Sequence, residues 1–125
     1  VQSYSRLGVC KAPKYISWSN NNRSMLIRIP AASGEYRRME LRSPDCTANP
    51  YIAFALLIWA SLDGLKNQII LPEKANVNLY TAGPKDVWDM ETLPMTLGAA
   101  SKLAEESEFI RKHLPESLIE YYCRH

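Results

Sequence analysis

The sequence has 125 residues, of which 46% are hydrophobic and 22% are charged. This length suits one modest domain, and the composition is typical of a folded globular protein rather than a disordered chain. The formal net charge of only +2 gives no electrostatic basis for binding nucleic acid or an acidic membrane surface. We therefore expect a single domain over residues 1–125, with no nucleic-acid partner and no membrane partner.

The cysteines and the N-terminal segment bear on the cellular setting. Cys10, Cys46 and Cys123 are widely spaced, and no C-x-x-C pair occurs. This pattern favours reduced, buried or half-buried thiols in the cytoplasm over a disulfide framework or a zinc ribbon. The first residues have no apolar run behind a basic end, so they do not form a signal peptide. Because they also lack an initiator Met, we interpret the chain as a piece of a longer protein.

The first third of the chain has the pattern of β-strands. We predict strands over residues 15–19, 24–30 and 36–42, because β-branched and aromatic residues recur there between turn-forming stretches. The connections between these strands are short, and short connections favour antiparallel neighbours. The sequence thus predicts an antiparallel sheet.

The next segment predicts a helix. Asn49 is a suitable N-cap, and Pro50 suits the first helical position. Residues 51–62 are almost all apolar, so we expect a buried core helix that weakens or ends near Asp63-Gly64. The run is shorter than the ~20 residues that span a bilayer.

The last part of the chain alternates between irregular and helical patterns. Residues 70–94 contain three prolines and no sustained period, which predicts a long loop of the kind that is often functional. Helical spacing returns after Thr96, continues to Leu114 and begins again at Pro115. The predicted fold class is α+β, with an antiparallel sheet packed with helices.

The predicted third strand carries the most informative residues. Arg38, Glu40 and Arg42 are two residues apart and so emerge on one face, while Met39 and Leu41 face the core. Arginine forks suit phosphate and carboxylate oxygens, and a carboxylate suits Mg²⁺ or Mn²⁺. The pattern is compatible with a site for an anionic ligand and a metal.

Arg23 and Arg28 extend this cationic surface from the preceding strand. The competing interpretation is a solvated strand face with cross-strand ion pairs. His113 and His125 lie far away in sequence and are interpreted as surface residues. No glycine-rich phosphate loop and no Ser-His-Asp set is present, so the residues alone leave both interpretations open.

Several runs, read in order and covering nearly the whole chain, resemble the C-terminal part of the catalytic domain of the glutamine synthetase family. They are Asn22-Arg23-Ser24 with Ile27-Arg28-Ile29-Pro30, Arg37-Arg38-Met39-Glu40-Leu41-Arg42-Ser43-Pro44-Asp45, Ala48-Asn49-Pro50-Tyr51, Leu62-Asp63-Gly64-Leu65-Lys66-Asn67 and Asn78-Leu79-Tyr80. Each run alone is weak evidence, but together they are specific.

The resemblance implies roles for single residues. Arg23 and Arg28 would contact phosphate, with Arg23 as the catalytic arginine that handles the transferred γ-phosphate. Arg38 would bind the nucleotide phosphates of ATP. Glu40 would ligate the Mg²⁺ or Mn²⁺ ion that bridges those phosphates. Arg42 would bind glutamate.

Arg6 would be a second glutamate-binding residue, and Tyr80 a possible site of adenylylation. The implied reaction is ATP-dependent: glutamate becomes γ-glutamyl phosphate, and ammonia then displaces phosphate. The resemblance also implies a cytoplasmic enzyme whose full-length subunits form a homo-oligomeric ring. The family's other metal ligands and its glutamate and ATP segment lie upstream, so we expect these 125 residues alone to be inactive.

One position departs from the family pattern. The run Gly8-Val9-Cys10-Lys11-Ala12-Pro13 has Lys11 where the family's flap has a glutamate that helps deprotonate ammonium. A cation does not attract ammonium or accept its proton in the same way. Two alternatives therefore stay open beside a glutamine-forming ligase. One is a γ-glutamyl ligase that uses another amine, and the other is a non-catalytic anion-binding or assembly module.

Overall fold

The computed structural model describes residues 2–124. The chain forms two compact units. The first comprises Val1–Asp45 and Pro72–Leu93, and the second comprises Cys46–Leu71 and Pro94–His125. All the predicted phosphate-, glutamate- and metal-binding residues belong to the first unit.

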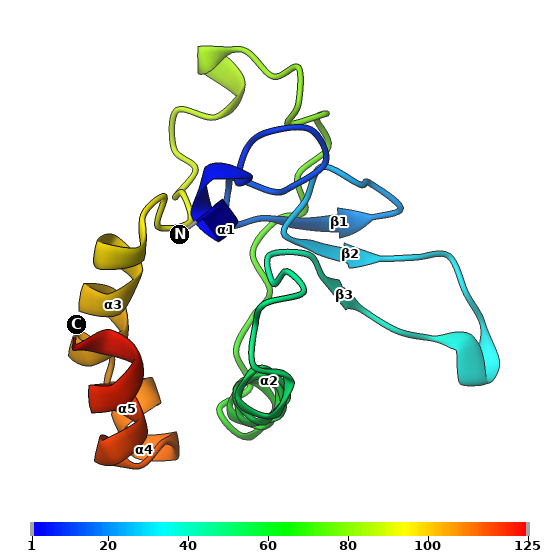
Figure 1. Ribbon diagram of the computed structural model, residues 1–125. Helices are drawn as coiled ribbons and strands as arrows, with labels where there is room; N and C mark the ends of the chain where they lie inside the picture. The colour runs from blue at the N-terminus through cyan, green and yellow to red at the C-terminus, as the bar shows by residue number, and fades with distance from the viewer. Residues whose placement is uncertain (1, 125) are drawn as a thin grey trace. The chain divides into compact units, whose positions relative to one another are not determined.

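The first unit contains a small three-stranded sheet with the strand order β1-β2-β3 (Figure 1). Its regular elements are short: α1 (Gln2–Ser5), β1 (Trp18–Asn20), β2 (Ile27–Ile29), the 3-10 turn η1 (Gly34–Tyr36), β3 (Glu40–Leu41) and the 3-10 turn η2 (Pro84–Asp86). With the helices of the second unit, this sheet confirms the α+β fold class.

The sheet is mixed rather than wholly antiparallel. β2 and β3 are antiparallel, as predicted, but β1 and β2 run parallel with Trp18 opposite Ile27. The prediction for the first pair was therefore wrong. The six residues between these strands do not form a hairpin: Asn21 adopts a positive φ of 57°, and the side chain of Asn22 accepts the backbone N–H of Ser24. This local turn returns the chain to the starting end of β1.

The predicted third strand is also much shorter in the structure. Residues 34–36 form the turn η1, and only Glu40 and Leu41 pair with β2. Met39, expected in the core, is 41% exposed. The core of this unit instead surrounds Met25, which is 0% exposed. Other buried members are Leu7, Ala12, Pro13 and Leu26.

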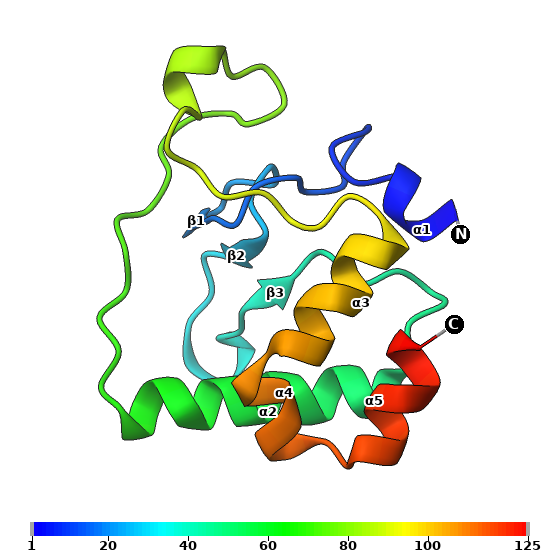
Figure 2. The same ribbon diagram turned by 90° about the vertical axis from the view of Figure 1, so that its left-hand side faces the viewer.

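The second unit is helical (Figure 2). Its helices are α2 (Pro50–Lys66), α3 (Leu97–Glu106), α4 (Glu108–His113) and α5 (Glu116–Cys123). The predicted caps are present, because the Asn49 side chain accepts the N–H of Tyr51 and Thr96 accepts the N–H of Ala99. Local sequence signals thus located these helices correctly.

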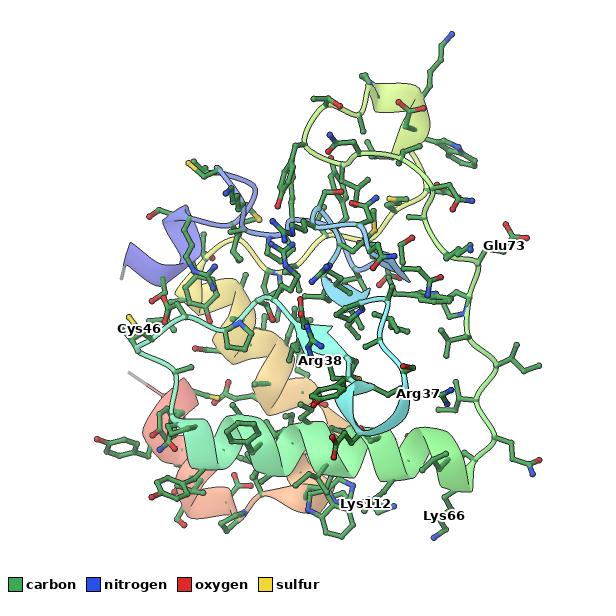
Figure 3. All side chains as sticks on the ribbon, turned by 90° about the vertical axis from the view of Figure 1, so that its right-hand side faces the viewer. Arg37, Arg38, Cys46, Lys66, Glu73 and Lys112 are labelled. Carbon is green, nitrogen blue, oxygen red and sulfur yellow. The ribbon has the colours of Figure 1, made fainter. Side chains whose placement is uncertain are left out.

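Helix α2 differs from its prediction in length and burial. It continues through Gly64 to Lys66, which lies at its end (Figure 3). None of its residues is buried in this chain, so the prediction of a core helix was wrong here. Trp59 stacks on His113 of α4 at 4.3 Å between ring centroids, but one contact of this kind covers only part of a helix that is apolar all round. An exposed stripe remains, made by Tyr51, Phe54, Ile58, Leu62 and Leu65.

The predicted irregular segment is confirmed, with η2 as its one helical turn among the described residues. Its part from Pro72 to Leu93 is held against the first unit by backbone hydrogen bonds. The Ile16 N–H donates to the Glu91 carbonyl at 2.8 Å, and the Leu93 N–H donates to Lys14 at the same distance. The segment is therefore a packed part of that unit rather than a free loop.

Two further expectations concern the thiols and the membrane. Cys10, Cys46 and Cys123 are free. Cys10 and Cys46 are exposed rather than buried, whereas Cys123 is half-buried as expected. Within residues 2–124, no helix combines the length and apolar character that crossing a membrane requires.

Candidate functional site

The centre of the candidate site is an ion-pair cluster on β2 and β3. Arg28 and Glu40 lie directly opposite each other in the antiparallel pair. Arg28 Nη1 is 2.8 Å from Glu40 Oε2, and Arg38 Nη2 is 3.3 Å from Glu40 Oε1. Each carboxylate oxygen of Glu40 therefore has its own guanidinium. The Arg28–Glu40 pair is thus the kind of cross-strand ion pair that the competing interpretation, a charged strand face, predicts.

The two arginines hold the pKa of the Glu40 carboxyl below its ordinary value. The hydrogen bond from Arg28 is the largest cause, desolvation opposes it, and the charges of Arg28 and Arg38 add to the lowering. Glu40 is consequently an anion at neutral pH. Because the group is open to solvent, this shift reflects a weakly stabilising, screened interaction.

The two arginines of the cluster differ in exposure. The side chain of Arg28 is only 16% exposed, and its Nε is buried without a hydrogen-bond partner among residues 2–124. Arg38 is more open. Its guanidinium contacts Glu40 and also donates to the carbonyl oxygen of Tyr36. Arg37 and Arg38 point away from each other (Figure 3). Arg38 is thus the member of the Arg37-Arg38 pair that joins the cluster.

The described residues do not form a complete metal site. Within residues 2–124, no group of three or more His, Cys, Asp or Glu side chains is placed to hold an ion. Glu40 offers one carboxylate of the hard-oxygen type that Mg²⁺ and Mn²⁺ prefer, and both of its oxygens are paired with arginines. Any metal bound here requires further ligands.

The printed contacts of the Arg42 side chain are with backbone carbonyls rather than with Glu40. Its guanidinium donates to the backbone carbonyls of Arg23, of Met25 at 3.1 Å and of Lys11 at 2.9 Å. A side chain that the resemblance assigns to glutamate binding is therefore a cross-link between three backbone positions in this structure. Arg23 is exposed, and its own carbonyl oxygen is one of the groups held.

Arg6 belongs to a different set of contacts. Its Nη2 donates to the carbonyl of Ser43, and its Nε lies 3.7 Å from a carboxylate oxygen of Asp45. The structure thus brings together Arg28, Arg38 and Glu40. It joins Arg23 and Arg42 through the backbone, and it gives Arg6 separate partners.

Tyr80 reaches the same two backbone positions as Arg42. Its hydroxyl lies 2.8 Å from the carbonyl oxygen of Lys11 and 2.7 Å from that of Arg23. The residue is 41% exposed. The sequence pattern singled out Tyr80 as a possible modification site but did not predict these contacts, because they join residues 57 and 69 positions apart.

Sequence reasoning missed the two polar residues on either side of Arg23. Asn22 Nδ2 donates to the carbonyl of Val77 at 2.9 Å, and the buried Ser24 Oγ accepts the N–H of Leu79 at 2.9 Å. Ser24 Oγ also lies 2.8 Å from Asn22 Oδ1. These contacts fasten residues 77–80 to the connection that carries Arg23. The sequence did contain one indication of these contacts: Arg23 lies between an Asn and a Ser, two residue types whose side chains often form hydrogen bonds with backbone groups.

The segment around Lys11 forms a tight turn. Gly8 has a φ of 75° and Cys10 a φ of 54°, and a Cβ on Gly8 would lie 3.2 Å from the Lys14 side chain. Glycine is favoured at position 8 because the positive φ would strain another residue and a Cβ would contact the Lys14 side chain closely. Lys11 is exposed, and its carbonyl oxygen is the acceptor shared by Tyr80 and Arg42.

Comparisons with known proteins identify the family of this chain. The family model described as glutamine synthetase, catalytic domain, matches residues 1–125. A glutamine synthetase from Methanosarcina mazei is 44% identical over 125 residues, which cover 98% of this chain and 28% of that protein. A glutamine synthetase from Staphylococcus aureus strain MW2 is 44% identical over 117 residues, which cover 91% of this chain and 26% of that protein.

Solved structures point the same way. The structure of a GmaS/ADP complex in conformation 1 matches with a TM-score of 0.73 and 29% identity. The match covers 88% of this chain and 25% of that one. The chain thus spans about a quarter of the length of the proteins it resembles, and over that span it belongs to the glutamine synthetase catalytic-domain family.

Proposed function

We propose that this chain forms one wall of the active site of an ATP-dependent ligase that makes glutamine from glutamate and ammonia through γ-glutamyl phosphate. The observation that carries the proposal is the Arg28–Glu40–Arg38 cluster, with Arg23 nearby in sequence, in a chain of the glutamine synthetase family. The structural relative that was solved as an ADP complex supports nucleotide as the ligand.

The arginines have the properties that binding phosphate requires. Phosphoryl transfer is catalysed mainly by positioning and by stabilising negative charge. Arg38 is partly open to solvent, and Arg23 is exposed, so both are available to phosphate oxygens. Arg28 is more enclosed and is fixed by Glu40. We assign Arg38 to the nucleotide phosphates, Arg28 to phosphate contact and Arg23 to the transferred γ-phosphate.

We assign glutamate binding to Arg6 and Arg42, following the family resemblance. Both side chains are engaged with this chain's own groups. A guanidinium has five N–H donors, and these contacts use only part of them, so a substrate carboxylate would bind through the remaining donors of each side chain.

We propose Glu40 as one oxygen ligand of Mg²⁺ or Mn²⁺. A bound divalent ion would neutralise phosphate charge. The described residues do not complete such a site, so we propose that its other protein ligands come from sequence outside this chain. This requirement fits a chain that spans about a quarter of its relatives. We further propose a cytoplasmic, ring-forming full-length protein, with the 125 residues alone inactive.

A first experiment measures nucleotide binding by the chain itself. We expect ADP with Mg²⁺, titrated calorimetrically, to bind weakly, and Arg38→Ala to abolish the heat. Arg37→Ala is the matched control, because the Arg37 side chain points away from that of Arg38. Equal losses in both variants would contradict the assignment of Arg38, and a complete absence of nucleotide binding is what a non-catalytic anion-binding or assembly module predicts.

A second experiment measures activity. In a protein of the relatives' length that contains this sequence, we expect glutamate- and ammonium-dependent phosphate release from ATP that Glu40→Ala abolishes. The 125-residue chain alone should give none. Release by the isolated chain, lost in Glu40→Ala, would contradict the expectation that it is inactive.

Lys11 favours a second candidate, a γ-glutamyl ligase that uses another amine. Its side chain is exposed and replaces an acidic residue in the family's flap pattern. Competition between ammonium and primary amines in the longer protein separates the two. Saturation by ammonium at low concentration supports glutamine formation. A preference for an alkylamine that Lys11→Glu reverses supports the second candidate.

A further inference from the structure

We infer that Tyr80 is a positioning residue that clamps the turn carrying Lys11 to the backbone of Arg23. The inference rests on the proposed function, because it concerns the arginine assigned to the transferred phosphate. It adds a role for residues 77–80 that the sequence pattern did not predict. All the residues involved lie in the first unit.

The geometry of the Tyr80 hydroxyl carries the argument. Its oxygen lies 2.8 Å from the Lys11 carbonyl oxygen and 2.7 Å from the Arg23 carbonyl oxygen. Two carbonyl oxygens repel each other unless a donor lies between them. A tyrosine hydroxyl carries one hydrogen, so it donates to one carbonyl at a time, and a second donor is needed for the other.

Arg42 provides that second donor. Its Nη1 donates to the Arg23 carbonyl and its Nη2 donates to the Lys11 carbonyl. The same two carbonyls are thus held by two side chains. Arg42 comes from the chain just after β3, and Tyr80 comes from the irregular segment between Pro72 and Leu93. A cation and a phenol on the same acceptors keep both carbonyls satisfied.

Tyr80 is itself held in place by the residues that flank Arg23. Asn22 donates to Val77, and the Leu79 N–H donates to Ser24. The Tyr80 N–H donates to the Asn78 side chain at 3.1 Å. Residues 77–80 are therefore bound to the side chains of Asn22 and Ser24, on both sides of Arg23. Because the loop and the connection brace each other, the Arg23 backbone has little freedom to shift.

The consequence concerns both ends of the clamp. A fixed Arg23 backbone limits the positions of its exposed guanidinium, which lowers the cost of ordering it on phosphate. The same contact limits the motion of the turn over residues 8–13. Tyr80 touches neither substrate nor reacting atoms in this inference and acts through Arg23 and Lys11.

The first test measures the clamp without any activity. Tyr80→Phe removes the hydroxyl and leaves the ring. By hydrogen–deuterium exchange, we expect the hydrogen-bonded amides of Gly8 and Ala12 to exchange about fivefold faster, the change that one lost hydrogen bond predicts. Tyr36→Phe is the control, because Tyr36 is 69% exposed in the same unit and should leave that segment unchanged. Unchanged exchange at residues 8–13 in Tyr80→Phe overturns the inference.

The second test uses turnover in a protein of the relatives' length. We expect Tyr80→Phe to lower kcat about five- to tenfold and to change the glutamate KM less than twofold. In an Arg23→Lys background the same substitution should cost less than about twofold, because its effect passes through Arg23. Equal losses of kcat in both backgrounds overturn the positioning role.

The two tests separate this inference from the proposed function. Faster exchange together with an Arg23→Lys variant of unaltered turnover supports the clamp and refutes the phosphate role of Arg23. Unchanged exchange together with a large loss of turnover in Arg23→Lys refutes the clamp and supports the phosphate role of Arg23.

Discussion

The two units of this chain are organised in opposite ways. The first has strands of only two or three residues, yet it contains the fully buried Met25 and a network of side-chain hydrogen bonds to distant backbone. The second is built from helices, of which α2, α3 and α4 have side-chain N-caps, yet among its described residues only Ile119 is buried. Regular secondary structure and burial are therefore separate properties here.

The difference shows where each unit obtains its order. In the helices, local caps and intrahelical hydrogen bonds are enough to define the elements. In the first unit, contacts between residues more than fifty positions apart, such as Asn22 with Val77, fix irregular backbone. All the candidate site residues lie in the unit that depends on distant contacts.

Truncating the core of the first unit should have the largest effect. Met25→Ala removes a fully buried side chain, and we expect it to lower the free energy of unfolding by about 2–5 kcal/mol. Met39→Ala is the control, because that side chain is 41% exposed. Urea unfolding monitored by circular dichroism measures both. Equal losses would mean that this unit has no core around Met25.

The apolar stripe of α2 provides the next test. We expect the chain to self-associate, since exposed Phe54 and Leu65 are 64% and 77% accessible and burying each is worth about 1.5–3 kcal/mol. Phe54→Lys with Leu65→Lys should shift the mass measured by sedimentation toward the monomer. Trp88→Lys is the control, because Trp88 is an apolar residue of the other unit and is 81% exposed. A mass unaffected by the α2 changes would show that the stripe does not drive association.

The hydrogen-bond network should respond less strongly. Ser24→Ala leaves the Leu79 N–H without its partner, and we expect a loss of about 1–3 kcal/mol in the free energy of unfolding. Ser33→Ala is the matched control, because Ser33 is exposed and its side chain makes no cap hydrogen bond. If the two variants unfold at the same urea concentration, distant polar contacts do not order this unit.

The smallest effect concerns pH. Arg28 and Arg38 lower the pKa of Glu40, so its ion pairs stabilise the fold fully above the ordinary value of 4.5 and lose that effect as pH falls through the lowered pKa. We expect wild type to be slightly more stable than Glu40→Gln at pH 7, and the difference to vanish in strong acid. Thermal unfolding at both pH values measures it. A difference that grows in acid would contradict the predicted sign.

Several features were predictable because their causes are local. The caps at Asn49 and Thr96 and the 3.6-residue spacing after Thr96 located the helices. The prolines of residues 70–94 predicted the irregular segment. Two-residue spacing correctly predicted Glu40 beside Arg38, and motif order identified the family, which the comparisons confirm.

Other features were not predictable because their causes are distant. No local pattern distinguishes Arg38, which pairs with Glu40, from Arg42, which turns to the carbonyls of Lys11 and Arg23. The parallel pairing of β1 with β2 depends on a turn built by Asn21 and Asn22. The exposure of α2 depends on which other residues pack against it, and no local pattern specifies those residues.

The sequence by itself determined the helices, the arginine-rich strand region and the family of this protein, because caps, periodicity and motif order act between near neighbours. Only the tertiary structure decided that Glu40 lies between two guanidiniums, that Met25 forms the core and that Tyr80 reaches Arg23. These outcomes depend on segments that approach one another across long stretches of chain. Which donor satisfies a given carbonyl is settled by that approach, since any arginine or tyrosine within reach can bond to it.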